Sequence, residues 1–210
     1  MSALAARDGA VARQVAGLAL QYPDTELLCL LPMLRSAVGT LPTPVGGPLT
    51  GLLDHLARTP PDTVAADYVA TFDLSRRHAL HLTYFTHGDT RKRGLALLRI
   101  KQTYRRFGYV LDDTELPDHL GVVLEFAATV DADAGGRLLQ EHRAGLELLG
   151  LALTEADSPY AAATTAVSAT LPPLHGSVRE AVARLAAEGP PGEEVGLDPF
   201  VPPEVSGARR

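Results

Sequence analysis

Residues 84–94 read Tyr84-Phe85-Thr86-His87-Gly88-Asp89-Thr90-Arg91-Lys92-Arg93-Gly94, and they carry the clearest structural signal in the chain. The stretch places a polar His-Gly-Asp turn and three basic residues between two segments with helical apolar spacing. Residues 76–106 contain nine Lys or Arg and a single acid, although the net charge of the chain is −6. Such segregation creates a local field that the net charge conceals. The sequence therefore favours a binding protein over one whose helices only pack together.

The composition around this stretch predicts an all-α fold. Of the 210 residues, 46% are hydrophobic, Ala and Leu are abundant, and Trp is absent. This composition favours helices over sheets. Apolar residues recur at helical spacing in about nine or ten segments, which proline and glycine separate. We predict a single-domain helical bundle over residues 1–187 and a disordered or extended acidic, Pro/Gly-rich tail over residues 188–210.

Several local features predict where helices begin, bend and end. Residues 41–48 contain three prolines and two glycines and are predicted to form a loop. Residues 74–86 fit a helical face, although alternate apolar residues would also suit a strand; helix is favoured because no partner strand is evident. Pro32 predicts a kink or break, Pro117 opens a helix, and Gly108 ends one.

The single cysteine, Cys29, excludes an internal disulfide and any site that needs several cysteines. It lies among four leucines, so we expect a buried thiol rather than a nucleophile. No segment approaches the roughly 18 apolar residues of a membrane span. Residues 1–9 also lack the apolar core of a signal peptide. We therefore expect a cytoplasmic protein without membrane insertion.

The second candidate stretch is Glu115-Leu116-Pro117-Asp118-His119-Leu120. Glu115 and Asp118 would interact favourably with the positive end of a following helix. Asp118 beside His119 also suggests a general base, but adjacent helical residues do not face each other. Residues 112–141 contain eight acids and one base. This acidic block either pairs with the basic block or lines the opposite side of a shared groove.

Other chemistry has weaker support. His78, His81 and His87 lack the further ligands that a zinc site requires, so no metal is expected. Phosphate-binding loops, dinucleotide motifs and nucleophile elbows are absent from the sequence, and nothing indicates an enzyme. A nucleic-acid partner is disfavoured by the negative net charge and the lack of a recognised motif. Two alternatives remain open: an enzyme that uses Asp118 and His119, and an anion-binding module built on Arg91-Lys92-Arg93.

Several linked motifs resemble the NarJ type of molybdenum cofactor assembly chaperone, the nitrate reductase delta subunit, within the TorD-like redox-enzyme maturation chaperones. The motifs are Leu-Gln-Tyr-Pro-Asp (20–24), Tyr-Val-Ala-Thr-Phe-Asp (68–73), residues 82–94, Glu-Leu-Pro-Asp-His-Leu (115–120) and Val-Leu-Glu-Phe (123–126). They occur in the same order as in that family and span about residues 15–130. A set of ordered motifs is far more specific than one short pattern.

The resemblance implies an all-α, cytoplasmic, non-catalytic chaperone. Such a protein binds the apo catalytic (alpha) subunit of respiratory nitrate reductase, including an N-terminal peptide related to a twin-arginine signal. It supports molybdenum cofactor insertion before membrane attachment. It holds no cofactor stably, although it could contact the molybdenum cofactor transiently and could also meet cofactor-delivery proteins. A different molybdoenzyme is the alternative client.

Binding of a helical peptide requires an apolar groove with charged margins. Four aromatic residues could form its floor, although core burial is the expected fate of most of them. Acids from the second stretch could meet a basic peptide, and the Arg-Lys-Arg triplet could meet acidic client surface or the phosphates of the cofactor. The predicted peptide-binding residues are Tyr68, Phe72, Tyr84, Phe85, His87, Asp89, Arg91, Arg93, Glu115, Pro117, Asp118, His119 and Glu125.

Overall fold

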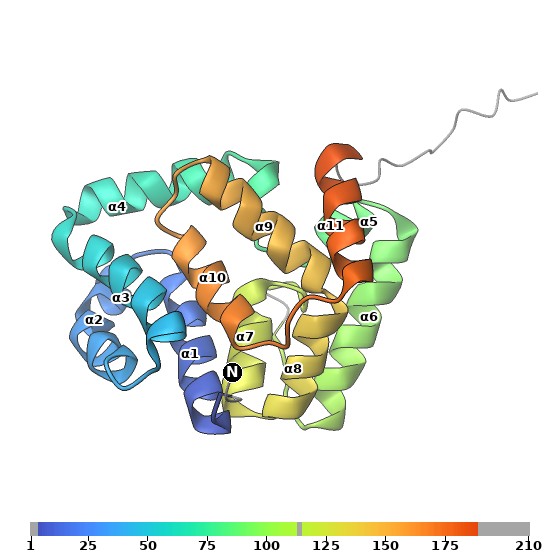
Figure 1. Cartoon of the computed structure of the whole chain (residues 1–210), viewed down its shortest axis with the longest axis horizontal. Helices are drawn as coiled ribbons and strands as arrows, with labels where there is room; N and C mark the ends of the chain where they lie inside the picture. The colour runs from blue at the N-terminus through green and yellow to red at the C-terminus, as the bar shows by residue number, and fades with distance from the viewer. Residues whose placement is uncertain (1–3, 113–114, 189–210) are drawn as a thin grey trace, which may run out of the picture.

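The computed structural model describes residues 4–112 and 115–188, and within these ranges it contains eleven α-helices (Figure 1). A π-turn (Val69–Asp73) extends α4, and a 3-10 turn spans Arg76–His78. The α-helices are α1 (Ala6–Ala19), α2 (Thr25–Val38), α3 (Thr43–Arg58), α4 (Pro61–Tyr68), α5 (Tyr84–His87), α6 (Arg91–Arg106), α7 (Leu120–Thr129), α8 (Ala132–Glu141), α9 (Arg143–Glu155), α10 (Ala161–Ala169) and α11 (Gly176–Glu188).

The all-α class is confirmed, because the only β-type pairing in the described ranges is an isolated bridge between His81 and His119. The predicted tail lies, from residue 189 on, outside the described residues. The helix count exceeds the expected nine or ten. The one-turn helix α5 and the break between α8 and α9 at His142 are both absent from the apolar spacing of the sequence.

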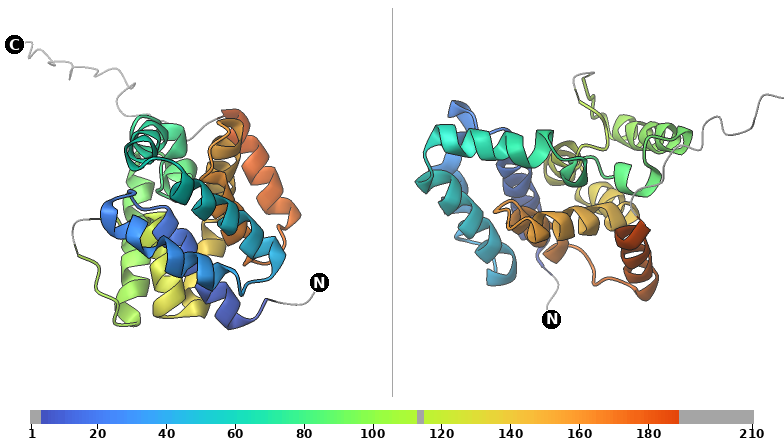
Figure 2. Two further views of the ribbon diagram at one scale, coloured as in Figure 1. Left: turned by 90° about the vertical axis from the view of Figure 1, so that its left-hand side faces the viewer. Right: turned by 90° about the horizontal axis from the view of Figure 1, so that it is seen from above.

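The core forms around α1, which packs against α7 on one side and against α10 on the other (Figure 1). Helix α10 also packs on α3 and α9, while α7 continues into α8. Figure 2 shows α6 and α11 as outlying helices, and α11 packs mainly on α9. Small residues permit the closest contacts: a Cβ on Gly135 would lie 2.2 Å from the Cβ of Ala127. Nearly every helix therefore buries apolar surface that would otherwise contact water.

Local signals placed several helix ends as expected. Asp24 caps α2, because its Oδ1 accepts a hydrogen bond from the Leu27 backbone N–H at 2.8 Å. Gly108 follows α6 with a φ of 71°, in the left-handed region that glycine adopts without strain. Pro32 lies inside α2, which the structure assigns as one helix rather than two.

Residues 41–48 were predicted as a loop, and that prediction is wrong, because α3 begins at Thr43. Pro44 occupies the second position of the helix, where an N–H has no helical partner in any case. Gly46 lets the first turn approach the end of α2, since a Cβ there would lie 3.1 Å from the Val38 carbonyl oxygen. Packing therefore overrides the loop-like composition.

The helix predicted over residues 74–86 is also wrong except for its last turn, α5. Its backbone instead pairs with the segment before α7. The Leu82 N–H donates to the Asp118 carbonyl at 3.1 Å, and the Leu120 N–H donates to the Leu80 carbonyl at 2.7 Å. For the same reason Pro117 does not open a helix, and α7 begins at Leu120.

The buried thiol expected at Cys29 is a third error, because the residue is exposed. Helix α2 buries Leu27, Leu31 and Leu34, which share a face that Cys29 does not belong to. The run of leucines around Cys29 therefore conceals a helix with one buried side. Among the described helices, none combines the length and the apolar character that a membrane crossing would need.

Candidate functional site

The centre of the motif region is the carboxylate of Asp118, which is fully buried. Its Oδ2 accepts hydrogen bonds from the Thr83 hydroxyl at 2.5 Å and from the Thr83 backbone N–H at 3.1 Å. The Arg93 guanidinium lies 3.7 Å from the same oxygen, and the His81 Nδ1 lies 3.3 Å from Oδ1. The carboxylate thus joins the loop before α5, the first turn of α6 and the segment before α7.

These contacts settle the charge of Asp118. Burial by itself would raise the pKa of this carboxyl, but the His81 ring at 3.3 Å, the hydrogen bonds from Thr83 and the nearby charge of Arg93 outweigh burial and lower it. The group is therefore ionised at neutral pH. A buried carboxylate held in this way joins segments of the fold, and its described contacts do not include His119.

We call the Asp118 carboxylate and its contacts with Thr83, Arg93 and His81 the hub. Arg93 connects the basic triplet, residues 91–93, to this hub. Its guanidinium pairs with Asp89 at 3.0 Å and lies 5.9 Å from the ring centre of Tyr84. Its side chain is only 16% exposed. Arg91 and Lys92 are exposed and form no ion pair with a residue that the structure describes. The triplet is therefore divided between one structural arginine and two solvent-facing cations.

Two half-buried histidines lie close to the hub. Burial lowers the pKa of His119, and the charge of His81 lowers it further, while Glu115 and Asp118 oppose the shift. Burial likewise lowers the pKa of His142. The rings of His81 and His119 meet edge to face with centroids 5.4 Å apart. Neither His119 nor His142 is expected to carry a charge at neutral pH.

The described ranges contain no group of three or more His, Cys, Asp or Glu side chains arranged to hold a metal ion. The separate set His78, His81 and His87 is not brought together either. The His78 ring bonds to the Thr71 carbonyl at 2.8 Å, away from the hub.

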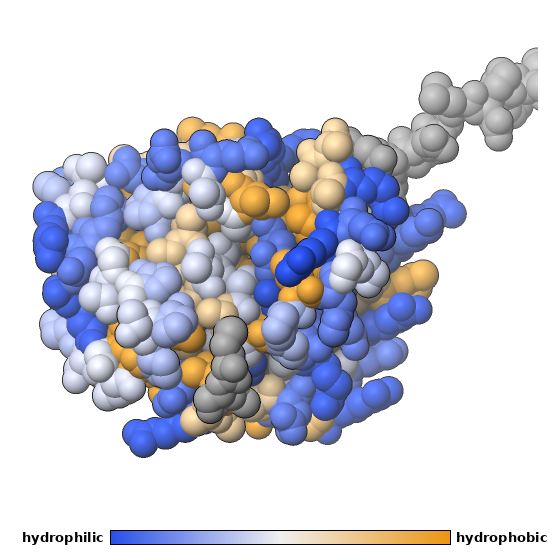
Figure 3. Space-filling view, viewed as in Figure 1, coloured by the Kyte–Doolittle hydropathy of each residue, from blue (hydrophilic) through white to orange (hydrophobic). Residues whose placement is uncertain are grey.

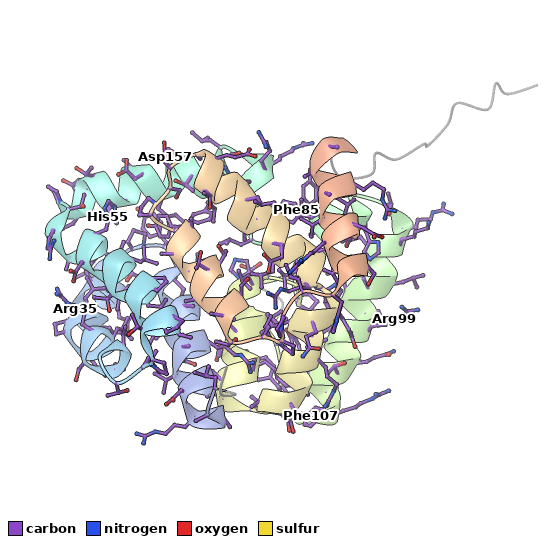
Figure 4. All side chains as sticks on the ribbon, viewed as in Figure 1. Arg35, His55, Phe85, Arg99, Phe107 and Asp157 are labelled. Carbon is purple, nitrogen blue, oxygen red and sulfur yellow. The ribbon has the colours of Figure 1, made fainter. Side chains whose placement is uncertain are left out.

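An apolar groove of about 150 Å³ opens beside the hub, between the 3-10 turn, α5, α9 and α11. Apolar side chains surface between α9 and α11 in Figure 3, and Figure 4 places Phe85 there. At one rim Arg77 pairs with Glu155 at 2.9 Å, and both side chains are exposed. The lining residues are Arg76, Arg77, Tyr84, Phe85, Leu148, Leu151, Ala152, Glu155, Leu185 and Ala186.

The other two predicted floor residues lie elsewhere. The ring centroids of Tyr68 and Phe72 lie 4.8 Å apart at a tilt of 51°, and both rings meet Tyr160 edge to face, which forms an aromatic cluster. The Tyr68 hydroxyl donates to the Leu20 carbonyl at 3.0 Å, which satisfies it inside the core. Burial raises the pKa of Tyr68 to about 12. Tyr68 is buried in the core, as expected for most of these rings, and Phe72 is half-buried against that core.

The predicted acidic margin is similarly dispersed. Asp118 and Pro117 are buried, so neither belongs to the surface of the groove. The Pro117 carbonyl accepts a hydrogen bond from the buried Tyr104 hydroxyl at 2.8 Å. Glu125 is exposed on α7 and lines a polar recess of about 200 Å³ against α1. Glu115 is exposed and bonds to the backbone of the next residue.

Sequence reasoning missed most of the groove, because α9 and α11 lie beyond the motifs. Helix α9 did contain a signal. Its inward face is formed by Leu146, Leu149 and Leu153. Leu151 lies on a second face of the helix and exposes 47% of its own surface. Leu151 lines the groove together with Leu148 and Ala152 of the same helix, so these residues form a patch rather than a single exposed side chain.

Comparison with known proteins identifies the class. The model of the nitrate reductase delta subunit family matches residues 39–166, which run from the end of α2 into α10. A solved structure of a redox enzyme maturation protein from Archaeoglobus fulgidus superposes with a TM-score of 0.57 at 22% identity, covering 76% of this chain and 91% of the other. The all-α fold predicted from the sequence therefore matches that of a solved protein.

Two curated relatives support the same class. The nitrate reductase-like protein NarX of Mycobacterium tuberculosis is 44% identical over 161 residues, which are 75% of this chain but only 24% of NarX. The Bacillus subtilis protein named "Probable nitrate reductase molybdenum cofactor assembly chaperone NarJ" is 31% identical over 164 residues, or 78% of this chain and 88% of that protein.

The chain belongs to the nitrate reductase delta subunit family, the family that its motifs resemble. The NarJ relatives of Bacillus subtilis and Escherichia coli are named as assembly chaperones, a non-catalytic class, in agreement with the prediction that the chain is not an enzyme.

Proposed function

We propose that this chain is an assembly chaperone that binds the apo catalytic subunit of a nitrate reductase, including its N-terminal peptide. In this role it supports insertion of the molybdenum cofactor in the cytoplasm before the enzyme attaches to the membrane. It contacts the cofactor transiently, if at all, and holds none. The helical domain predicted over residues 1–187 performs this function. The alternative client is another molybdoenzyme.

The observation that carries the proposal is the groove lined by Tyr84 and Phe85. It combines an apolar floor from three helices with Arg76, Arg77 and Glu155 at its rim. An amphipathic peptide helix would place its apolar face on such a floor and its charged residues against the rim. The small volume suits a few anchoring side chains rather than a large folded surface.

The buried hub supports this function indirectly. Asp118 fixes the loop before α5, and α5 supplies both aromatic residues of the groove. The family motif around Asp118 is therefore a positioning element for the groove, whereas the residues that contact the peptide come from α5, α9 and α11.

Calorimetry with the full chain and a peptide of the client's N-terminus tests the proposal. Leu151→Asp places a charge on the apolar floor and should weaken binding about tenfold or more. Met33→Asp is the matched control, because Met33 is 60% exposed on α2, outside the groove lining, and should leave the affinity unchanged.

Absence of binding heat with both the peptide and the apo catalytic subunit would overturn the proposal. If both variants weakened binding equally, the groove would not be the peptide-binding site. Co-purification should further show the apo subunit bound and the cofactor-loaded subunit released.

A further inference from the structure

Helix α6 has a solvent-facing side that the groove does not use. Residues 91, 95, 98, 102 and 105 follow one another by four and three, so they form a single stripe along the helix. The opposite stripe, Ala96, Ile100 and Tyr104, is buried. We call the exposed side the α6 outer face: Arg91, Leu95, Leu98, Gln102 and Arg105, flanked by Lys92, Arg99 and Arg106.

Two leucines at the centre of this face are unusually exposed. Leu95 exposes 61% of its surface and Leu98 exposes 49%. They lie one turn apart, and a single apolar residue there would need no explanation. Arginines and a lysine surround the pair, and Figure 3 shows hydrophilic side chains projecting along the edge occupied by α6. Figure 4 shows Arg99 pointing outward from the same edge.

The described residues supply no ion-pair partner for the cations of this face. Helix α6 contains seven Lys or Arg and no acid, so the net charge of −6 for the whole chain leaves a net −13 for the rest. Arg91, Lys92, Arg99, Arg105 and Arg106 form no ion pair with a described residue. Arg91 and Lys92 also lie in the first helical turn, where the helix dipole disfavours positive charge. The face thus carries local electrostatic costs that a negatively charged partner would relieve.

The pattern of this face selects the chemistry of that partner. A helix with leucines at matching spacing could pack along Leu95 and Leu98, and acids beside its leucines would meet the flanking arginines. A nucleic acid would engage the arginines but leave the leucines without an apolar partner. An anionic membrane would repel the remaining net −13, and two leucines supply little apolar area for insertion. A protein helix therefore satisfies both features.

We propose that the α6 outer face binds an acidic amphipathic helix of a partner protein. This surface is separate from the groove, because none of its residues lines the groove. The inference is therefore independent of the proposed client peptide. It gives the chain two docking surfaces of different chemistry, one mainly apolar and one cationic.

The test uses the full chain and a fluorescein-labelled helical peptide with leucines at i, i+3, i+4 and i+7 and glutamates at the flanking positions. Fluorescence anisotropy at low salt should show saturable binding. Leu95→Ser/Leu98→Ser should weaken it about tenfold, because both apolar contacts are lost. Arg99→Glu/Arg106→Glu should weaken it at least as much. Circular dichroism of each variant checks that the fold is retained.

Met33→Ser/Arg7→Glu is the matched control, since both side chains are exposed on other helices, and its affinity should stay within about twofold. Leu151→Asp in the groove should also leave this binding intact. Absence of binding, or binding that the leucine variant does not weaken, would overturn the proposal. Sedimentation with phosphatidylcholine–phosphatidylglycerol vesicles tests the membrane: leucine-dependent vesicle binding without peptide binding would assign the face to lipid and overturn the proposal as well.

Discussion

Replacement of Asp118 by Ala should be among the most destabilising single changes in this chain. The substitution removes the acceptor of two Thr83 hydrogen bonds, at 2.5 and 3.1 Å. It also leaves Arg93, only 16% exposed, without the carboxylate at 3.7 Å. Removal of one partner from a buried charged pair usually costs about 3–5 kcal/mol, because the other partner stays desolvated. We expect a loss in that range.

The assay is urea unfolding at pH 7.5, followed by far-ultraviolet circular dichroism. Asp89→Ala is the matched control, because Asp89 pairs with the same Arg93 but is 67% exposed, and it should cost less than about 0.5 kcal/mol. Asp118→Asn should be intermediate, since the amide oxygen can still accept from Thr83 but carries no charge. In the double variant Asp118→Ala/Arg93→Met, part of the loss should be recovered, because the largely buried guanidinium that keeps only its exposed partner Asp89 is also removed.

A loss below about 1 kcal/mol for Asp118→Ala would refute the reasoning, since the carboxylate could then not be a buried link between three segments. A double variant less stable than Asp118→Ala alone would refute the specific role given to Arg93. Groove binding by Asp118→Asn is a useful second readout, because a displaced α5 should weaken client-peptide affinity even where the chain remains folded.

Three further outcomes are expected. Gly145→Ala should lower the free energy of unfolding in urea by about 1–3 kcal/mol, because the new Cβ would lie 2.2 Å from the Leu82 carbonyl oxygen. Gly94→Ala is the control: its Cβ would meet nothing within 4 Å, so this variant should be more stable by about 0.5–1 kcal/mol. The opposite order of stabilities would contradict the packing around Gly145. Since burial lowers the pKa of His119, the contribution of its neutral ring to stability should be complete above about pH 6.5 and decline below that pH. In unfolding curves recorded between pH 7.5 and 5.5, His119→Gln should lose less stability with falling pH than the unmodified chain. An unchanged dependence of stability on pH would count against this role of His119. Cys29 should react with Ellman's reagent in the native chain, and Cys29→Ser should change stability by less than about 0.5 kcal/mol; reaction only after unfolding would contradict the exposed position.

The sequence predicted those parts of the structure that depend on neighbouring residues. Apolar spacing placed most helices, the Asp24 cap began α2, and Gly108 ended α6. These signals are local, because a capping hydrogen bond or a left-handed glycine involves residues only a few positions apart. The ordered motifs predicted the family, which the comparisons confirmed.

Local reasoning failed where distant segments meet. Residues 74–86 fit a helical pattern, yet the backbone of Leu80 and Leu82 pairs with the segment before α7, and the Thr83–Asp118 contact joins residues 35 positions apart. The prolines and glycines of residues 43–48 suit a loop, yet they lie in α3, where Gly46 meets the end of α2. Propensity is a weak preference of less than about 1 kcal/mol per residue, which tertiary contacts readily exceed.

By itself, then, the sequence determined the helical class, most helix positions, the segregation of charge and the family. Only the tertiary structure decided that Asp118 is a buried link, that Tyr68 is buried while Phe72 is half-buried against the core, and that Tyr84 and Phe85 share a groove with α9 and α11. The physical reason is that exposure is a property of the packed chain. Whether a carboxylate or an aromatic ring faces water depends on which distant helix covers it, and no local pattern encodes that neighbour.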